Sequence, residues 1–235
     1  MIARRRRWPP RLVTLVGALL TLATAAGATA EPADRDAWPW AAVGRVERNG
    51  GGPCSGVLVA ARTVLTVGHC VARRGPWRAE EPERLAVRFG EQAYPVVAVR
   101  VAASSPYATG GRLGPVRHDW AVLKLAAAPA VEPVAYEGPS AARRAFVADA
   151  PLAKVGWVQG RREQDPDCRI RRLALDAAAF SFACDGGPGQ GRSGSALLIR
   201  TPTGFAVVAV QSAEARTGVV TLGIAVSPEP TVLAR

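Results

Sequence analysis

Residues 54–70 read CSGVLVAARTVLTVGHC, and this stretch decides the fold. It contains two short runs of apolar and β-branched residues, Gly56–Ala60 and Thr63–Val67, with a brief break between them. Short runs of this composition, bounded by small and polar residues, are typical of neighbouring β-strands. The stretch therefore predicts two strands that lead into His69, which stands next to Cys70.

Ten further runs of the same kind lie along the chain, one before this stretch and nine after it. All twelve runs divide into six on each side of a proline- and alanine-rich connector, Ala126–Gly138. No stretch after the first thirty residues keeps a helical period long enough to predict a helix. The 24 glycines and 19 prolines also suit many short strands joined by turns. The sequence predicts an all-β protein of two packed barrels. The ten runs are Ala41–Val46, Leu85–Phe89, Val96–Val101, Trp120–Leu125, Leu152–Val158, Ile170–Leu175, Phe180–Ala183, Ala196–Ile199, Phe205–Val210 and Val219–Val226.

The first thirty residues have the composition of a secretory signal peptide. Arg4–Arg7 and Arg11 precede an apolar run, Leu12–Ala26, and the segment closes on Ala28-Thr29-Ala30. A basic start, an apolar middle and small residues at an A-x-A site are typical of a cleaved signal. The apolar run is short for a membrane-spanning helix. We expect cleavage after Ala30, no membrane anchor on the mature chain, and a secreted or periplasmic protein.

Composition and charge exclude several classes of protein. Of the 235 residues, 49% are hydrophobic and 21% are charged, which excludes a disordered or collagen-like chain. The formal charge is +11, and loss of residues 1–30 removes five arginines and no acidic residue, which leaves +6. There is no zinc-finger spacing and no aromatic-plus-basic signature, so we expect a solvated arginine-rich surface and no nucleic-acid partner.

Four cysteines lie in the expected mature chain, and an even number in an exported protein favours disulfides over metal ligands. Three pairings are possible, and we favour the one that closes two short loops around apolar runs. Metal binding would need histidines nearby, but the chain has only two, which are far apart in sequence. We therefore expect no metal. The favoured pairs are Cys54 with Cys70 and Cys168 with Cys184.

Three segments carry candidate chemistry, and the first is His69 at the end of residues 54–70. A disulfide at Cys70 would hold its turn rigid, as a catalytic base requires. The second segment, residues 118–125, reads HDWAVLKL and places Asp119 at the mouth of an apolar strand. A carboxylate buried there needs a donor, and an imidazole N–H is a good one. Taken alone, His69 is explained equally well by a local hydrogen bond, and Asp119 is better explained as a strand cap or a solvent-exposed loop residue. We expect His118 to be a loop residue.

The third segment, residues 184–199, reads CDGGPGQGRSGSALLI. Glycines crowd both sides of Ser193, and an apolar strand follows. Such a backbone takes angles closed to other residues and can aim consecutive N–H groups at one point. An oxyanion hole needs fixed donors of this kind where negative charge develops. A flexible surface loop is the alternative, but the nearby Cys184 and the strand Ala196–Ile199 argue against it.

Together the three segments resemble the trypsin/chymotrypsin-like serine peptidases. The resemblance runs from about Trp38 to Pro228 and is carried by LTVGHC at 65–70, DWAVLKL at 119–125 and GRSGS at 191–195, in the order His, Asp, Ser. It implies a chymotrypsin-like fold of two packed six-stranded antiparallel β-barrels. The expected domains are residues 31–130, with His69 and Asp119, and residues 131–235, with Ser193.

The same resemblance assigns roles to the candidate residues. His69 would be the general base, Asp119 its orienting carboxylate and Ser193 the nucleophile, while the N–H groups of Gly191 and Ser193 would form the oxyanion hole. The implied function is a secreted serine endopeptidase that hydrolyses peptide bonds through an acyl-enzyme. The implied partner is a protein or peptide substrate, and we expect a monomer without cofactor.

The residue before the nucleophile departs from the animal trypsin pattern. Those enzymes carry an aspartate there, which pairs with a new N-terminus after zymogen cleavage, whereas this chain has Arg192. The expected mature start, EPAD at 31–34, also lacks the Ile-Val-Gly-Gly that would insert. This excludes activation by that ion pair. The motif GRSGS, two disulfides and an export signal resemble the bacterial, glutamyl-endopeptidase-like branch instead.

The primary specificity stays open. Gln211, Ser212 and Ala213 resemble the strand that walls the primary substrate pocket, and Ser212 is expected to hydrogen-bond to Asp119. Gln211 stands where glutamyl-specific relatives place a histidine, which weakens a preference for glutamate. No acidic pocket floor is evident either, because Gly187 occupies the trypsin-like position six residues before the nucleophile.

Two other folds with a serine nucleophile fail on chain order. An α/β-hydrolase needs its histidine after the serine, but both histidines precede Ser193. A subtilisin-like order would need an aspartate before His69, such as Asp34 or Asp36, and a long helix after the serine, which Pro202 and Gly204 would stop. The second hypothesis is a secreted, catalytically inactive homologue that acts as a binding protein, because a cation directly before the nucleophile could disturb its loop.

Overall fold

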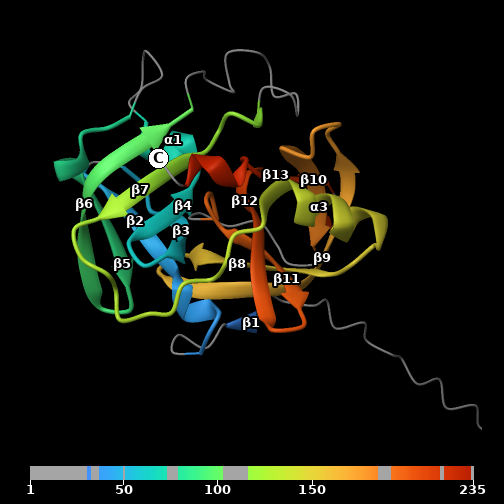
Figure 1. Cartoon of the computed structure of the whole chain (residues 1–235), viewed down its shortest axis with the longest axis horizontal. Helices are drawn as coiled ribbons and strands as arrows, with labels where there is room; N and C mark the ends of the chain where they lie inside the picture. Colours follow the sequence, from blue (N-terminus) through green and yellow to red (C-terminus); the bar gives the residue numbers. More distant parts are fainter. Residues whose placement is uncertain are drawn as a thin grey trace, which may run out of the picture.

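Two β-barrels lie side by side in the computed structural model, which describes residues 31–32, 37–49, 51–72, 79–102, 116–184, 192–217 and 220–233 (Figure 1). The first barrel closes in the order β2-β3-β4-β7-β6-β5, with antiparallel pairing throughout. Its alternating sequence puts one face of each strand inward, so Leu85, Val87 and Phe89 are buried while the residues between them are partly exposed. The strands are β2 (Val43–Arg48), β3 (Cys54–Ala60), β4 (Thr63–Thr66), β5 (Leu85–Phe89), β6 (Gln92–Val101) and β7 (Ala121–Leu125).

The second barrel follows the order β9-β10-β13-β12-β11-β8 and closes where β8 pairs with β9. A two-residue strand, β1 (Glu31–Pro32), adds to β9. Phe180 and Phe182 fill this barrel and meet edge to face, with 6.3 Å between their ring centroids. The strands are β8 (Leu152–Val158), β9 (Arg161–Leu173), β10 (Ala179–Cys184), β11 (Ala196–Thr201), β12 (Gly204–Thr217) and β13 (Val220–Val226). The prediction of an all-β fold with two six-stranded barrels is confirmed.

Each of the twelve predicted strands is present, but three of them extend at least four residues beyond the predicted run. One is β6, which begins at Gln92 instead of Val96. The run expected at Ile170–Leu175 belongs to β9, which already begins at Arg161, and the run expected at Phe205–Val210 belongs to β12, which continues to Thr217. We propose residues 31–130 and 131–235 as the limits of the two domains, since β7 ends at Leu125 and β8 begins at Leu152.

One ten-residue helix, α3 (Gly138–Val147), was not predicted. Pro139 occupies its first turn, where a missing N–H is tolerated. Ala141, Ala142 and Ala145 form its buried face, and the helix packs against β12 and β9 of the second barrel. Shorter helical segments are α1 (Gly68–Val71), η1 (Trp40–Ala42), η2 (Pro82–Arg84) and η4 (Pro230–Val232).

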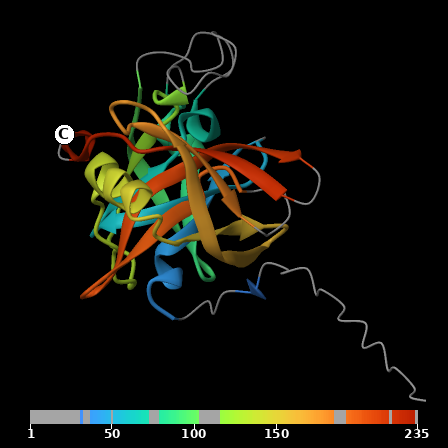
Figure 2. The same cartoon turned by 90° about the vertical axis from the view of Figure 1, so that its right-hand side faces the viewer.

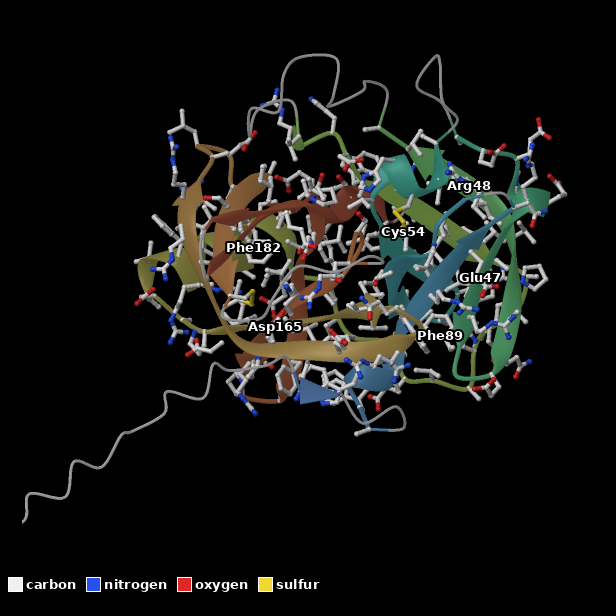
Figure 3. The ribbon with its side chains drawn as sticks, turned by 180° about the vertical axis from the view of Figure 1, so that it is seen from behind. Glu47, Arg48, Cys54, Phe89, Asp165 and Phe182 are labelled. Atoms are coloured by element: carbon white, nitrogen blue, oxygen red, sulfur yellow. A yellow bond between two sulfur atoms is a disulfide. The ribbon has the colours of Figure 1, made fainter. Side chains whose placement is uncertain are left out.

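The barrels meet where β2 and β3 pack against β8 and β11. Figure 2 looks along the line that joins the two barrels, with the second barrel in front of the first. Two hydrogen bonds cross the junction to the same acceptor. The Val43 carbonyl oxygen accepts from Trp157 Nε1 and from Arg162 Nε, both at 3.1 Å. Figure 3 shows Phe89 in the first barrel and Phe182 in the second, with Asp165 on the strand that runs between them. The junction fixes how loops from the two barrels approach one another.

The predicted signal peptide, residues 1–30, lies outside the described residues. Within the ranges that are described, no helix combines the length and apolar composition that crossing a membrane requires.

Candidate active site

His69 stands on α1, one turn of helix that follows β4 directly. The disulfide between Cys54 and Cys70 ties this turn to the start of β3, with 6.2 Å between the two Cα atoms. The second disulfide joins Cys168 to Cys184 in the other barrel. These are the two pairs that the sequence favoured. The His69 side chain is 27% exposed, so its ring is fixed on one side and accessible on the other.

Asp119 precedes β7 and is fully buried, at 0% exposure. Its two oxygens hold His69 at two points: Oδ2 lies 2.8 Å from Nδ1 of the ring, and Oδ1 accepts a hydrogen bond from the His69 backbone N–H at 2.9 Å. This double contact fixes both the position of the histidine backbone and the rotation of its ring. Residues 50 positions apart in sequence therefore meet as the sequence predicted.

Ser212 supplies a further contact, because its Oγ donates to Asp119 Oδ2 at 2.5 Å. The register of β12 against β13 shifts between Gln211 and Ala213, which leaves Ser212 as the extra residue of a bulge. Bulges re-aim side chains in this way. The predicted hydrogen bond between Ser212 and Asp119 is confirmed.

The environment of Asp119 acts on its pKa in two directions. Burial raises the pKa of the carboxyl, but hydrogen bonds from His69 and Ser212 and the attraction to His69 outweigh burial, so the pKa lies below its ordinary value. Asp119 is therefore an anion in the neutral range. A buried anion beside a histidine stabilises the imidazolium that forms when the ring takes up a proton.

Ser193 lies in a tight turn between the two barrels. The Arg192 carbonyl accepts a hydrogen bond from the Ser195 N–H at 2.9 Å and closes the turn. Gly194 has φ of +81°, which is typical of the third residue of a type II turn. A Cβ at this glycine would lie 1.9 Å from the Ser55 carbonyl oxygen, so the backbone approaches β3 too closely for any other residue.

Ser55 links the turn to the histidine. Its N–H donates to the Ser193 carbonyl at 2.7 Å, and its neighbour Cys54 forms the disulfide to Cys70, the residue after His69. Ser55 Oγ also accepts a hydrogen bond from the Trp157 N–H at 2.8 Å, which connects β3 to β8. This short chain of contacts brings the segment of Ser193 and the segment of His69 to one place.

Arg192 points away from this turn into the second barrel, where it is 5% exposed. Its guanidinium lies 3.0 Å from Asp165 Oδ2 and 3.3 Å from Glu163 Oε2, both on β9. Lys154 Nζ lies 2.6 Å from the same Oδ2 of Asp165. The arginine that replaces the expected aspartate is thus paired with acidic residues in the interior.

The remaining predicted site residues are placed as follows. Gly191, assigned to the oxyanion hole, lies outside the described residues. Gln211 is buried on β12 and its Nε2 donates to Glu214 Oε2 at 3.0 Å, while its backbone N–H and C=O bond to Ser195 and Gly194 of the turn. The proposed pocket wall is therefore attached to the segment of the nucleophile. His118 lies beside Arg117, whose Nε is 3.2 Å from its Nε2, as expected of a loop residue.

Sequence reasoning missed several residues that shape this site. Ser55 was quoted only within residues 54–70, just before the predicted strand, and Glu163, Asp165 and Lys154 were given no role. Two features of the sequence could have pointed to the charged residues. The run REQDPD at 162–167 has more charge than is usual for a strand, and Lys154 is one of only two lysines in the chain.

Two groups of side chains have the spacing of metal ligands, but both contain a disulfide. One joins His69 to Cys54 and Cys70, and the other joins Asp165 to the Cys168–Cys184 pair. Sulfur atoms bonded to each other do not provide the thiolates that metal ions bind. Neither group among the described residues is therefore a candidate metal centre.

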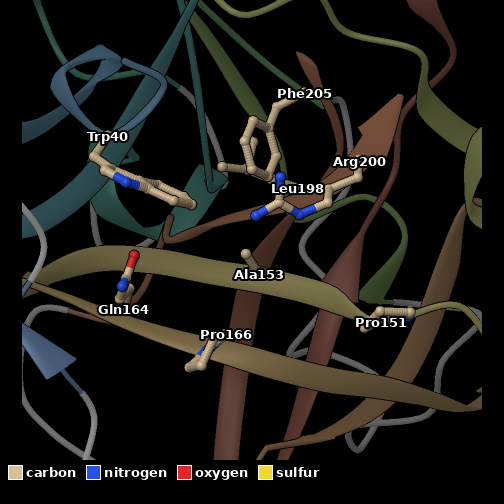
Figure 4. A pocket seen from close by; sticks show the side chains of 8 residues that line it. All are labelled: Trp40, Pro151, Ala153, Gln164, Pro166, Leu198, Arg200 and Phe205. Carbon is tan, nitrogen blue, oxygen red and sulfur yellow. The ribbon is translucent and has the colours of Figure 1, made fainter. Parts of the chain in front are cut away.

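A separate hollow lies on the second barrel, where Trp40, Phe205 and Arg200 face strands β8 and β9 (Figure 4). The rings of Trp40 and Phe205 are 5.3 Å apart, and the Arg200 guanidinium lies 4.8 Å from the Phe205 ring centre. None of the three candidate catalytic residues lines it. We therefore treat it as distinct from the candidate active site.

Comparisons with known proteins agree with this geometry. The protein-family model described as Trypsin matches residues 29–227. A solved structure of a Glu endopeptidase in complex with MPD matches with a TM-score of 0.63 and 18% identity, over 88% of this chain and 94% of that chain. At that identity the likeness shows the fold alone. A search of curated proteins found no match. The family match spans both barrels, and the chain therefore belongs to the trypsin family of serine proteases.

Proposed function

We propose that this protein is a secreted serine endopeptidase that cleaves peptide bonds with Ser193 as nucleophile, His69 as general base and Asp119 as orienting carboxylate. The observation that carries the proposal is the double contact that the fully buried Asp119 makes with His69, reinforced by Ser212. Because Nδ1 of the ring faces the carboxylate, we assign the proton transfer to Nε2.

The proposed reaction proceeds through an acyl-enzyme. Ser193 Oγ attacks the carbonyl carbon of the scissile bond while its proton passes to His69 Nε2, and the carbonyl oxygen becomes an oxyanion. Backbone N–H groups of Gly191 and Ser193 stabilise that charge. The tetrahedral intermediate then expels the amine, which takes the proton from His69 and leaves an ester on Ser193. Water then attacks this ester while His69 takes up a proton of the water, and His69 returns the proton to Ser193 Oγ as the ester bond breaks and the carboxylic acid departs.

The second candidate function is a binding protein without turnover. The reason for considering it was the cation at position 192, directly before the proposed nucleophile. The pairing of Arg192 with Asp165 and Glu163 speaks against it, because the charge is neutralised in the interior and does not face the turn. Catalysis remains the proposal that the geometry supports best.

We further propose that residues 1–30 are removed on export and that the mature protein is a secreted or periplasmic monomer. Protein or peptide substrates would approach along β12, where Gln211, Ser212 and Ala213 wall the primary pocket. The N-terminal sequence of the exported protein and its mass in solution check these points directly.

Cleavage of a peptide library tests the proposed function and reveals the primary specificity at once. We expect the exported protein to cleave internal bonds, and the Ser193→Ala variant to lose about 10⁴-fold or more in kcat. Folded wild-type protein that cleaves no peptide and no ester, at any site in the library, would contradict the proposal and favour the binding protein.

A further inference from the structure

Four charged side chains meet in the interior of the second barrel, next to the turn of Ser193. Arg192, Asp165, Glu163 and Lys154 are 5%, 3%, 8% and 2% exposed. Two are basic and two are acidic, so the group as a whole is neutral. Charges are expensive to remove from water and persist in an interior only when they are paired. We call these four residues the charge cluster.

The strands of the barrel determine how the charge cluster is arranged. Glu163 and Asp165 are two residues apart on β9, so their side chains leave the same face of the strand. Lys154 on β8 stands directly opposite Asp165 in the register of the two strands. The acidic pair is therefore built into the wall of the barrel, and Arg192 is the member that arrives from a loop.

The guanidinium of Arg192 reaches both carboxylates of this wall. Nη1 donates to Asp165 Oδ2 at 3.0 Å, and Nη2 donates to Glu163 Oε2 at 3.3 Å. A planar guanidinium that binds two carboxylates is held in orientation as well as in position. The backbone of residue 192 is thereby anchored to β9.

That anchor acts on the residue next in sequence, Ser193. The turn of Ser193 is held from the first barrel by the Ser55 N–H, which donates to the Ser193 carbonyl. It is held from the second barrel by the Arg192 side chain. An oxyanion hole requires backbone N–H groups in a fixed position before charge develops. Two anchors on opposite sides of a tight turn provide such fixation.

We propose that Arg192 is a positioning residue that holds the Ser193 turn in its active conformation through Asp165 and Glu163. This inference rests on the proposed function and extends it to activation. The acidic residues of the barrel wall pair with Arg192, as an inserted N-terminal ammonium group pairs with the aspartate at this position in animal trypsins, and the folded protein is active without a cleavage that creates such an ammonium group. Lys154 balances the second acidic charge. Burial lowers the pKa of Lys154 and the charge of Arg192 lowers it further, while Asp165 opposes this shift.

A neutral double variant tests this role without leaving an unpaired buried charge. Arg192→Met alone would leave Asp165 with Lys154 and would leave the buried Glu163 with only the largely exposed Arg161, whose Nε lies 2.7 Å from Glu163 Oε1, and this would destabilise the barrel. Arg192→Met combined with Glu163→Gln keeps Lys154 paired with Asp165. The matched control is Arg169→Met combined with Asp167→Asn, because this pair of substitutions also removes an ion pair of β9 but one that does not reach the turn.

We expect the double variant to fold, with kcat on an ester substrate reduced about 10²-fold, as for loss of one oxyanion donor. KM should change little, and affinity for a peptide aldehyde, which forms a tetrahedral adduct with the serine, should fall in parallel with kcat/KM. The control should retain the kcat of the wild type. Arg192→Lys keeps the charge but not the two-pronged contact, so its kcat should lie between those of the wild type and the double variant.

The outcomes separate the two proposals. An active wild type with an equally active double variant, or with an Arg192→Lys variant as active as the wild type, overturns the positioning role and leaves the proposed function intact. If the double variant does not fold, Arg192→Lys alone decides the question. A folded wild type without any turnover overturns the proposed function and this inference with it.

Discussion

Replacing Asp119 by asparagine is the substitution whose effect the structure defines most closely. Asp119 Oδ1 accepts from the His69 backbone N–H, and Oδ2 faces both Nδ1–H of the ring and the Ser212 hydroxyl. An asparagine side chain has one oxygen and one NH2 group. If its oxygen keeps the backbone N–H, its NH2 group faces two donors. The ring escapes this conflict by moving its proton from Nδ1 to Nε2, and Nε2 then cannot accept the proton of Ser193.

The expected effect is a loss of about 10⁴-fold in kcat, because a tautomer change of this kind removes the base while the geometry stays. That factor corresponds to about 5 kcal/mol of transition-state stabilisation. The assay is steady-state hydrolysis of an ester substrate, with unfolding by guanidinium to confirm the fold. Asp176→Asn is the control, because Asp176 pairs with Arg117 at the surface and should leave kcat unchanged. A kcat for Asp119→Asn within tenfold of the wild type would refute the reasoning.

The remaining predictions concern stability. The lowered pKa of Asp119 stabilises the folded protein above about pH 4, the range of an unfolded aspartate, and this contribution is lost as the pH falls through the folded-state pKa. Ser212→Ala should therefore reduce the free energy of unfolding most at pH 7, and the reduction should shrink as the pH falls through the folded-state pKa of Asp119; a reduction that stays constant while Asp119 takes up its proton would count against it. Gly156→Ala should lower the melting temperature of the protein strongly, since the new Cβ would lie 1.8 Å from Ser195 Oγ. Adding Ser195→Gly should recover part of the lost melting temperature, and no recovery would rule out this contact as the cause. Replacing both cysteines of the Cys168–Cys184 disulfide, which spans 16 positions, should lower the free energy of unfolding by about 3 kcal/mol in denaturant titrations, and a loss below about 1 kcal/mol would contradict this.

Strands whose inward residues are apolar were predictable from the sequence. β5 shows the regular case, because Leu85, Val87 and Phe89 alternate with more exposed residues. The first half of β9 was missed for a physical reason. Its buried residues include Arg162, Glu163 and Asp165, so a run that hydropathy assigns to a loop is in fact part of the barrel wall. Charged residues that pair across the interior are invisible to a hydrophobic pattern.

The helix α3 was missed for a different reason. Its buried face consists of alanines, Ala141, Ala142 and Ala145, whose weak hydrophobicity gives little contrast over ten residues. Pro139 at its start was a usable signal. Helix ends of this kind carry information where the apolar stripe does not.

The candidate site was predictable in its residues but not in its supports. The order of His69, Asp119 and Ser193 follows from motifs, and the contact of Asp119 with His69 is present as expected. The partners of Arg192 could not be read from the sequence, because they lie 27 and 29 positions away and are selected by the register of β8 and β9. Local patterns identify reactive groups, whereas the interior contacts that hold them depend on the assembled barrel.

Labelling with a fluorophosphonate probe, followed by peptide mapping, tests the central claim most directly. The probe reacts with a serine hydroxyl only when a neighbouring base activates it. We predict that wild-type protein is labelled at Ser193 and that labelling disappears in His69→Ala while the fold persists. Folded wild-type protein that stays unlabelled, or equal labelling of the His69→Ala variant, would contradict the claim that these residues form one catalytic unit.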